Sequence, residues 1–199
     1  MNRADLRSLL SSRVEWPIAR LLAGLGLSPN AITLVGMLGA VAAGLLASQG
    51  LLFAAGAATL LAGILDLFDG SVARLTGKKS RFGALLDSTA DRVSEAAVLV
   101  GLAVHYAGEG SLVGVALSCA AMAGSMMVSY VRARAGGLSV DCEVGLFTRP
   151  ERVAAMGAGL IAGEWLGGVL LVVLGATAGL TAITTVQRVL HVRRELDGR

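Results

Sequence analysis

The sequence predicts an all-α integral membrane protein with six transmembrane helices and an N-terminal amphipathic interfacial helix. Composition is the first observation, because 55% of the 199 residues are hydrophobic and the mean hydropathy is +0.73. These residues also gather in blocks of about 20, the length that spans a bilayer. Glycine is abundant, with 27 residues, as close-packed membrane helices tolerate well. We expect one domain over residues 1–199.

The N-terminal segment, residues 1–22, is expected to form the interfacial helix. Its aliphatic residues fall on one helical stripe that arginines interrupt, which suits a helix on an anionic membrane surface. The stripe consists of Leu6, Leu9, Leu10, Val14, Ile18 and Leu21, and the arginines are Arg3, Arg7, Arg13 and Arg20. A broken, solvent-exposed helix is the alternative. Because charges run through this segment, we expect no cleavable signal peptide.

The six predicted membrane spans form a bundle over residues 31–190. Ser28, Pro29 and Asn30 provide start signals for the first span. The fifth span is short and rich in glycine. The spans cover residues 31–48, 51–74, 82–106, 112–132, 152–163 with a few flanking residues, and 166–190.

The basic residues predict the orientation of this bundle. With six spans, both termini, the turn at 74–82 and the loop at 132–152 share one side of the membrane. Every Lys and Arg lies on that side or within about a turn or two of it, and the opposite loops have none. By the positive-inside rule, we expect a multi-pass cell-membrane protein with both termini on the cytoplasmic side.

Four aspartates stand where the second span ends and the third begins, in the segment DLFDGSVARLTGKKSRFGALLDSTAD. Asp66 and Asp69 are three residues apart, and Asp87 and Asp91 are four apart, so each pair lies on one face of its helix. The short basic turn TGKKSR joins the two helices. We therefore expect the helices to pack antiparallel, with the four carboxylates converging at the cytoplasmic edge of the membrane.

Such a cluster needs compensating positive charge. One aspartate at mid-bilayer costs roughly 2.5–3.5 kcal/mol on insertion scales, and Arg74 and Arg92 alone cannot neutralise four. Hard oxygen ligands without nearby His or Cys indicate Mg²⁺ or Mn²⁺. We expect two such ions per site, an arrangement suited to phosphoryl displacement. The alternatives are an ion-pair network that only joins two helices and a divalent-cation transporter, although no acidic relay continues toward the opposite side.

The same residues resemble the signature of the CDP-alcohol phosphatidyltransferases. The match is Asp66-x2-Asp69-Gly70-x2-Ala73-Arg74-x8-Gly83-x3-Asp87-x3-Asp91, with eight fixed positions over 26 residues. The six-span prediction also fits this family, so the resemblance covers essentially the whole chain. It implies an enzyme that transfers the phosphatidyl group of CDP-diacylglycerol to an alcohol and releases CMP.

The resemblance also implies roles for individual residues. Asp66 and Asp87 would bridge two metal ions. Asp69 would complete one metal site and Asp91 the other, and Asp91 would also act as general base. The chemistry agrees, because a diphosphate under attack needs its charge neutralised and a carboxylate beside a metal can accept the hydroxyl proton. The CDP-lipid would be held by Asn30, Thr33, Gly70, Arg74 and Ser80.

Arginines at the cytoplasmic ends of the last three spans indicate an anionic acceptor, since guanidinium binds phosphate bidentately. The candidates for binding the acceptor phosphate are Arg132, Arg149, Arg152 and Arg188. Membrane topology alone would also favour basic residues here, above all Arg134. The RARA and RPER segments resemble the branch of the family that makes phosphatidylinositol phosphate, which implies inositol phosphate as acceptor. The alternative acceptor is glycerol 3-phosphate, which would give phosphatidylglycerol phosphate.

We therefore expect a Mg²⁺- or Mn²⁺-dependent transferase embedded in the bilayer, with its active site on the cytoplasmic side. Its expected substrates are CDP-diacylglycerol and inositol phosphate, and no nucleic-acid partner is expected. The resemblance and the glycine-rich spans favour a homodimer.

Overall fold

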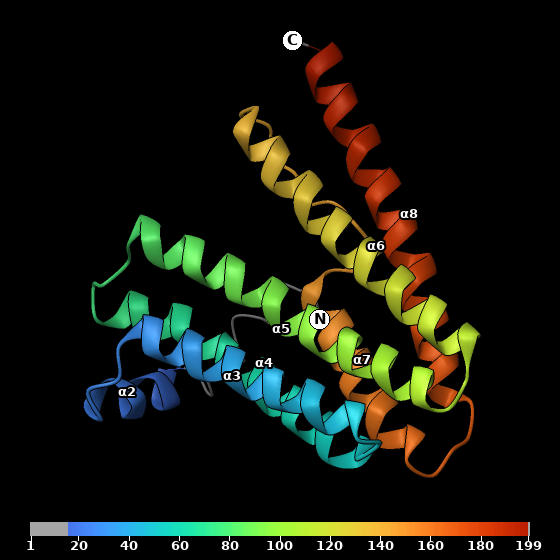
Figure 1. Ribbon diagram of the computed structural model, residues 1–199. Helices are drawn as coiled ribbons and strands as arrows, with labels where there is room; N and C mark the ends of the chain where they lie inside the picture. The colour runs from blue at the N-terminus through green and yellow to red at the C-terminus, as the bar shows by residue number, and fades with distance from the viewer. Residues whose placement is uncertain (1–15, 199) are drawn as a thin grey trace, which may run out of the picture.

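The computed structural model describes residues 16–198, and all regular secondary structure in this range is helical (Figure 1). The helices are α2 (Trp16–Gly24), α3 (Pro29–Ser48), α4 (Leu52–Leu75), α5 (Arg81–Gly108), α6 (Leu112–Gly137), α7 (Arg149–Gly163) and α8 (Val169–Asp197). Each predicted span lies along one of the helices from α3 to α8. The all-helical fold class is therefore confirmed. Most of the predicted N-terminal stripe lies outside the described residues. Only its last two members, Ile18 and Leu21, lie in α2.

Four of these helices, α3, α4, α6 and α8, are long and apolar enough to cross a membrane. Helix α5 has the length, but charged residues are spread along its first half. Helix α7 has only 15 residues. Length and composition therefore support a membrane protein.

The helices form two groups, which are joined by α7 and by the packing of α5 against α6. Helices α3, α4 and α5 pack against one another through α3, while α6 and α8 run side by side and lean away from the start of α5 (Figure 1). Helix α7 contacts both α4 and α8. The main core takes residues from every helix between α3 and α8, among them Ala43, Ala55, Leu99, Ala121, Leu160 and Leu174.

Two glycines, Gly44 and Gly101, let α3 and α5 approach each other closely. A Cβ atom on Gly101 would collide with the backbone of Gly44, and a Cβ on Gly44 would collide with the carbonyl of Ala97. Small residues of this kind let the backbones of membrane helices come together. The contact fixes α3, which carries Asn30 and Thr33, against the helix that carries the second pair of aspartates.

A side chain from a distant turn caps the start of α4. The residue before this helix, Leu51, provides no side-chain hydrogen bond. Glu164 accepts a hydrogen bond from the backbone N–H of Phe53 at 3.0 Å, and the ring of Trp165 packs edge-on against that of Phe53. A carboxylate is favoured there because the first N–H groups of a helix lack partners. The cap therefore ties α4 to the turn between α7 and α8.

The glycine contact predicts that Gly101→Ala lowers the unfolding temperature of the protein in detergent. The added methyl group meets backbone that cannot yield without separating α3 from α5, and such overpacking costs roughly 1–3 kcal/mol. Gly108→Ala in the same helix is the matched control, because a Cβ there meets nothing within 4 Å. The control is expected to be neutral or slightly stabilising. Equal unfolding temperatures for the two variants would contradict this account.

Candidate active site

The turn between α4 and α5 brings the aspartate pairs together. Helix α4 ends at Leu75, and Gly77 adopts a positive φ of 65°, a conformation that suits glycine. Helix α5 then starts with Ser80 as its N-cap, whose hydroxyl accepts a hydrogen bond from the backbone N–H of Gly83 at 2.9 Å. The chain therefore reverses within a few residues, so that the end of α4 lies beside the start of α5.

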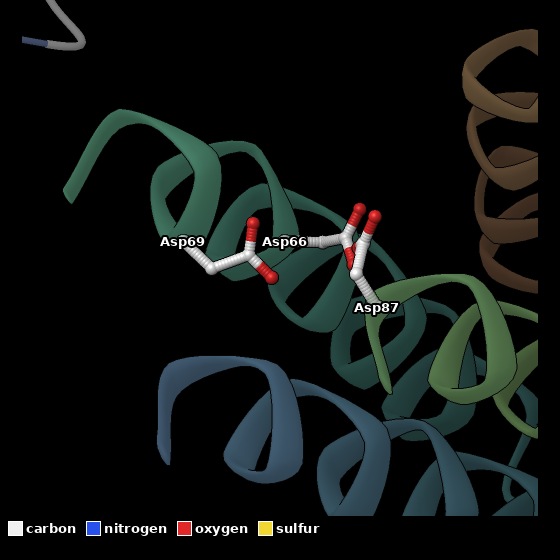
Figure 2. Close-up of side chains that lie close together, drawn as sticks. All are labelled: Asp66, Asp69 and Asp87. Atoms are coloured by element: carbon white, nitrogen blue, oxygen red, sulfur yellow. The ribbon is translucent and has the colours of Figure 1, made fainter. Parts of the chain in front are cut away.

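Three of the four aspartates form a compact oxygen cluster. Asp66, Asp69 and Asp87 each offer one carboxylate oxygen, and these oxygens all lie within 4.8 Å of one another. Figure 2 shows the carboxylates of Asp66 and Asp87 meeting from α4 and α5, with Asp69 beside them. The donors are all hard carboxylate oxygens, which fits a divalent cation such as Mg²⁺ or Mn²⁺. This is the convergence that the sequence predicted for these three residues.

Thr33 connects α3 to this cluster. Its hydroxyl donates a hydrogen bond of 2.6 Å to Oδ2 of Asp69, and both side chains are buried. A hydrogen bond to one oxygen fixes the orientation of the carboxylate and leaves the other oxygen for a second partner. Thr33, predicted as a contact to the CDP-lipid, therefore also positions a predicted metal ligand.

The fourth aspartate, Asp91, binds an arginine instead of joining the cluster. Arg149 at the start of α7 donates from Nη1 to Asp66, and its Nη2 lies 2.9 Å from Oδ1 of Asp91. The contact to Asp91 is an ion pair whose geometry is not that of a hydrogen bond. Arg149, predicted to bind the acceptor phosphate, therefore lies between carboxylates of α4 and α5.

A cavity of about 550 Å³ opens beside the cluster, and Asp69 and Asp87 line it. Every residue predicted to hold the CDP-lipid also lines it, namely Asn30, Thr33, Gly70, Arg74 and Ser80. Three further basic residues in the lining, Lys78, Lys79 and Arg81, were not assigned from the sequence. Their position in the sequence, between Arg74 and Gly83 of the aspartate signature, could have indicated that they lie at this site. Cations here suit a diphosphate.

A second, much smaller cavity of about 40 Å³ lies on the side of Asp66 and Asp91. Its polar lining includes Arg149, Arg152 and Glu95. Arg152 is only 3% exposed, and its Nε and Nη2 donate to the two carboxylate oxygens of Glu95 at 2.6 and 2.9 Å. Glu95 was not predicted as a site residue, although it lies one helical turn after Asp91 on the same face of the helix.

The other two predicted acceptor arginines have different surroundings. Arg188 is 3% exposed and donates to the backbone carbonyls of Val144 and Val128 at 2.8 and 2.7 Å. Arg132 is exposed and lies 3.1 Å from a carboxylate oxygen of Glu143. Neither arginine lines the two cavities beside the aspartates. Arg188 holds the α6–α7 loop in place, while Arg132 stays open to the solvent side.

Known proteins are similar to this chain in both sequence and fold. A phosphatidylinositol phosphate synthase of Cutibacterium acnes is 36% identical over 197 residues, which cover 94% of this chain and 95% of that protein. An archaetidylinositol phosphate synthase of Methanothermobacter thermautotrophicus is 36% identical over 184 residues, 90% of this chain and 89% of that one.

Solved structures of one such synthase have a fold similar to that of this chain. The phosphatidylinositol phosphate synthase of Mycobacterium tuberculosis, crystallised with CDP-DAG bound, superimposes with a TM-score of 0.83 at 33% identity. The superposition covers 90% of this chain and 94% of that one. The same synthase has been solved in complex with manganese and citrate, again with a TM-score of 0.83.

The model of the family described as CDP-alcohol phosphatidyltransferase matches residues 26–189, which include the aspartate signature and all helices from α3 to α7. Together with the identity over nearly the whole length, this match shows that the chain is an enzyme of the CDP-alcohol phosphatidyltransferase family.

Proposed function

We propose that the protein transfers the phosphatidyl group of CDP-diacylglycerol to inositol phosphate, giving phosphatidylinositol phosphate and CMP. The observation that carries this proposal is the position of the aspartate cluster, beside a cavity lined by all five residues assigned to the CDP-lipid. The M. tuberculosis structure with CDP-DAG bound supports the donor. The names of both sequence relatives contain inositol phosphate, which favours this acceptor over glycerol 3-phosphate.

The aspartates would hold two divalent cations, Mg²⁺ or Mn²⁺. Asp66, Asp69 and Asp87 would bind one, and Asp66, Asp87 and Asp91 the other. When bound, these cations neutralise the diphosphate and make CMP a better leaving group. The manganese complex of the M. tuberculosis synthase supports a divalent cation in this fold.

The chain's own residues would bind both substrates and move one proton. The CDP headgroup occupies the larger cavity, where Arg74 and the basic turn before α5 face its phosphates. Asp91 accepts the proton of the inositol phosphate hydroxyl. That oxygen then forms a bond to the phosphorus that carries the diacylglycerol, while the bond from this phosphorus to the CMP oxygen breaks.

The four arginines Arg132, Arg149, Arg152 and Arg188 would form the acceptor side of the site. Arg149 and Arg152 line the small cavity beside Asp66 and Asp91, where the attacking hydroxyl must arrive. Arg132 offers an exposed guanidinium at the end of α6. Arg188 would act through the α6–α7 loop, whose carbonyl at Val144 it binds.

The membrane arrangement follows from the helices and the basic residues. Helices α3 to α8 would cross the bilayer six times as one domain over residues 1–199, and residues 1–22 would lie on its surface. The aspartates, both termini and the α6–α7 loop would face the cytoplasm. Membership of the family and the glycine-rich spans also lead us to propose a homodimer.

The proposed reaction predicts that the purified protein releases CMP from CDP-diacylglycerol only with a suitable acceptor and a divalent cation. Inositol phosphate should support turnover, while inositol and serine should not, because they lack the phosphate that the arginines bind. EDTA should abolish release, and Mg²⁺ or Mn²⁺ should restore it. Faster release with glycerol 3-phosphate would instead identify a phosphatidylglycerol phosphate synthase.

Replacement of the proposed base, Asp91→Asn, should lower kcat by at least about 10²-fold, because the hydroxyl proton loses its acceptor. The variant should keep its unfolding temperature in detergent. Asp141→Asn in the α6–α7 loop is the matched control, since Asp141 lines neither cavity. A variant of Asp91 with normal turnover would remove its assignment as base.

The exposed arginine predicts a substrate-specific effect. Arg132→Gln should raise the KM for inositol phosphate about tenfold, since one charge-assisted contact is lost. The KM for CDP-diacylglycerol should stay unchanged. Arg134→Gln, two residues further along α6, serves as the control for a purely topological arginine. Equal shifts of both KM values would argue against a phosphate contact at Arg132.

A further inference from the structure

One guanidinium serves two carboxylates at the point where α4, α5 and α7 meet. Arg149 binds Asp66 and Asp91 at the same time, and all three side chains are only partly shielded, between 17% and 24% exposed. Asp66 also belongs to the oxygen cluster with Asp69 and Asp87. Arg149 therefore occupies the side of Asp66 that a second divalent cation would share with Asp91.

The pairing leaves two buried atoms unsatisfied. Nε of Arg149 and Oδ1 of Asp91 lie away from solvent and have no hydrogen-bond partner in the structure. Buried polar atoms of this kind are normally paired. The opposite charges of Arg149 and Asp91 therefore lie close together, but they form no hydrogen bond. Such a contact is expected where the carboxylate has a better partner in another state of the enzyme.

The neighbouring arginine on α7 shows the opposite behaviour. Arg152 is 3% exposed, binds Glu95 through both carboxylate oxygens and also donates to the carbonyl of Phe147 at 3.3 Å. This bidentate pair fixes the first turn of α7 against α5. Arg149 on the same turn is then free to change partners without moving its helix.

We propose that Arg149 is the internal counter-cation of the second metal position and passes to the acceptor phosphate once Asp66 and Asp91 bind a divalent cation. The reason is electrostatic, because a guanidinium and a divalent cation cannot share the same two carboxylates without strong repulsion. A phosphate is the natural new partner for the displaced guanidinium. This second half rests on the proposed function.

The small cavity agrees with such a handover. Arg149, Asp66 and Asp91 all line it, and its volume is about 40 Å³. Ligand pockets are typically about 300 Å³ or more, so a sugar phosphate requires the lining to rearrange. Withdrawal of Arg149 from the two aspartates opens the cavity and supplies a phosphate ligand in one movement.

The handover has a thermodynamic consequence. If the metal displaces Arg149 toward the acceptor, metal and phosphorylated acceptor each raise the affinity for the other by the same factor. An acceptor without phosphate cannot take over the guanidinium. The device therefore selects for phosphorylated alcohols.

The test measures Mn²⁺ binding to the full-length protein in detergent, from the electron paramagnetic resonance signal of free Mn²⁺. Arg149→Gln should tighten the weaker Mn²⁺ site about tenfold, because the competing internal cation is gone. Arg92→Gln is the matched control. It also removes a cation next to Asp91 in the sequence, but Arg92 donates to the backbone carbonyl of Ser88. Unchanged affinity in Arg149→Gln, or an equal gain in the control, overturns the proposal.

The coupling is measured on the wild-type protein, so it does not depend on the folding of a variant. Inositol phosphate should tighten Mn²⁺ binding at least about fivefold, with inositol as the control and a protein-free titration correcting for Mn²⁺ bound by the phosphate itself. Absence of this effect overturns the handover. A third outcome separates the two proposals. If Arg149→Gln binds Mn²⁺ more tightly but the wild-type protein does not release CMP with inositol phosphate, the counter-cation role stands and the proposed acceptor is rejected.

Discussion

Mutual repulsion among carboxylates at the meeting point of α4 and α5 is the constraint on which the rest of the structure depends. Asp66, Asp69 and Asp87 place oxygens within 4.8 Å of one another, next to apolar helices that offer little solvation. Packing elsewhere holds them there. The glycine contact between α3 and α5 and the Glu164 cap on α4 act far from the cluster, yet they fix the helices that carry it.

The α6–α7 loop is the second part of this arrangement, because it decides where α7 begins. Arg188 binds the loop carbonyl at Val144, and the hydroxyl of Thr184 accepts a hydrogen bond from the backbone N–H of Phe147. Helix α7 starts directly after this anchored stretch, with Arg149 as its first residue. Arg188, predicted to bind the acceptor phosphate, thus holds the backbone of the loop. Arg149, which reaches Asp66 and Asp91, belongs to the helix that this loop positions.

Local patterns predicted the helices and the aspartate pairs, because spacings of three and four residues and apolar blocks are properties of the chain itself. The partners of the arginines are different. Arg149 lies 83 residues from Asp66, and Arg152 lies 57 residues from Glu95. No local spacing records such contacts, and a guanidinium suits an internal carboxylate as well as a phosphate. The sequence therefore predicted where the arginines gather better than it predicted what they bind.

The two cavities beside the aspartates explain why four carboxylates are useful for this chemistry. Asp69 and Asp87 line the larger cavity with the residues proposed to bind the CDP-lipid, whereas Asp66 and Asp91 line the smaller one with two arginines. The two cavities share no lining residue. Displacement at phosphorus keeps the attacking and leaving oxygens roughly in line, on opposite sides of the reacting atom. A site with separate nucleotide and acceptor compartments meets this requirement when the phosphorus lies between them, at the cluster. In the proposed reaction, Asp91 lies on the side from which the hydroxyl attacks, where a base is needed to remove its proton.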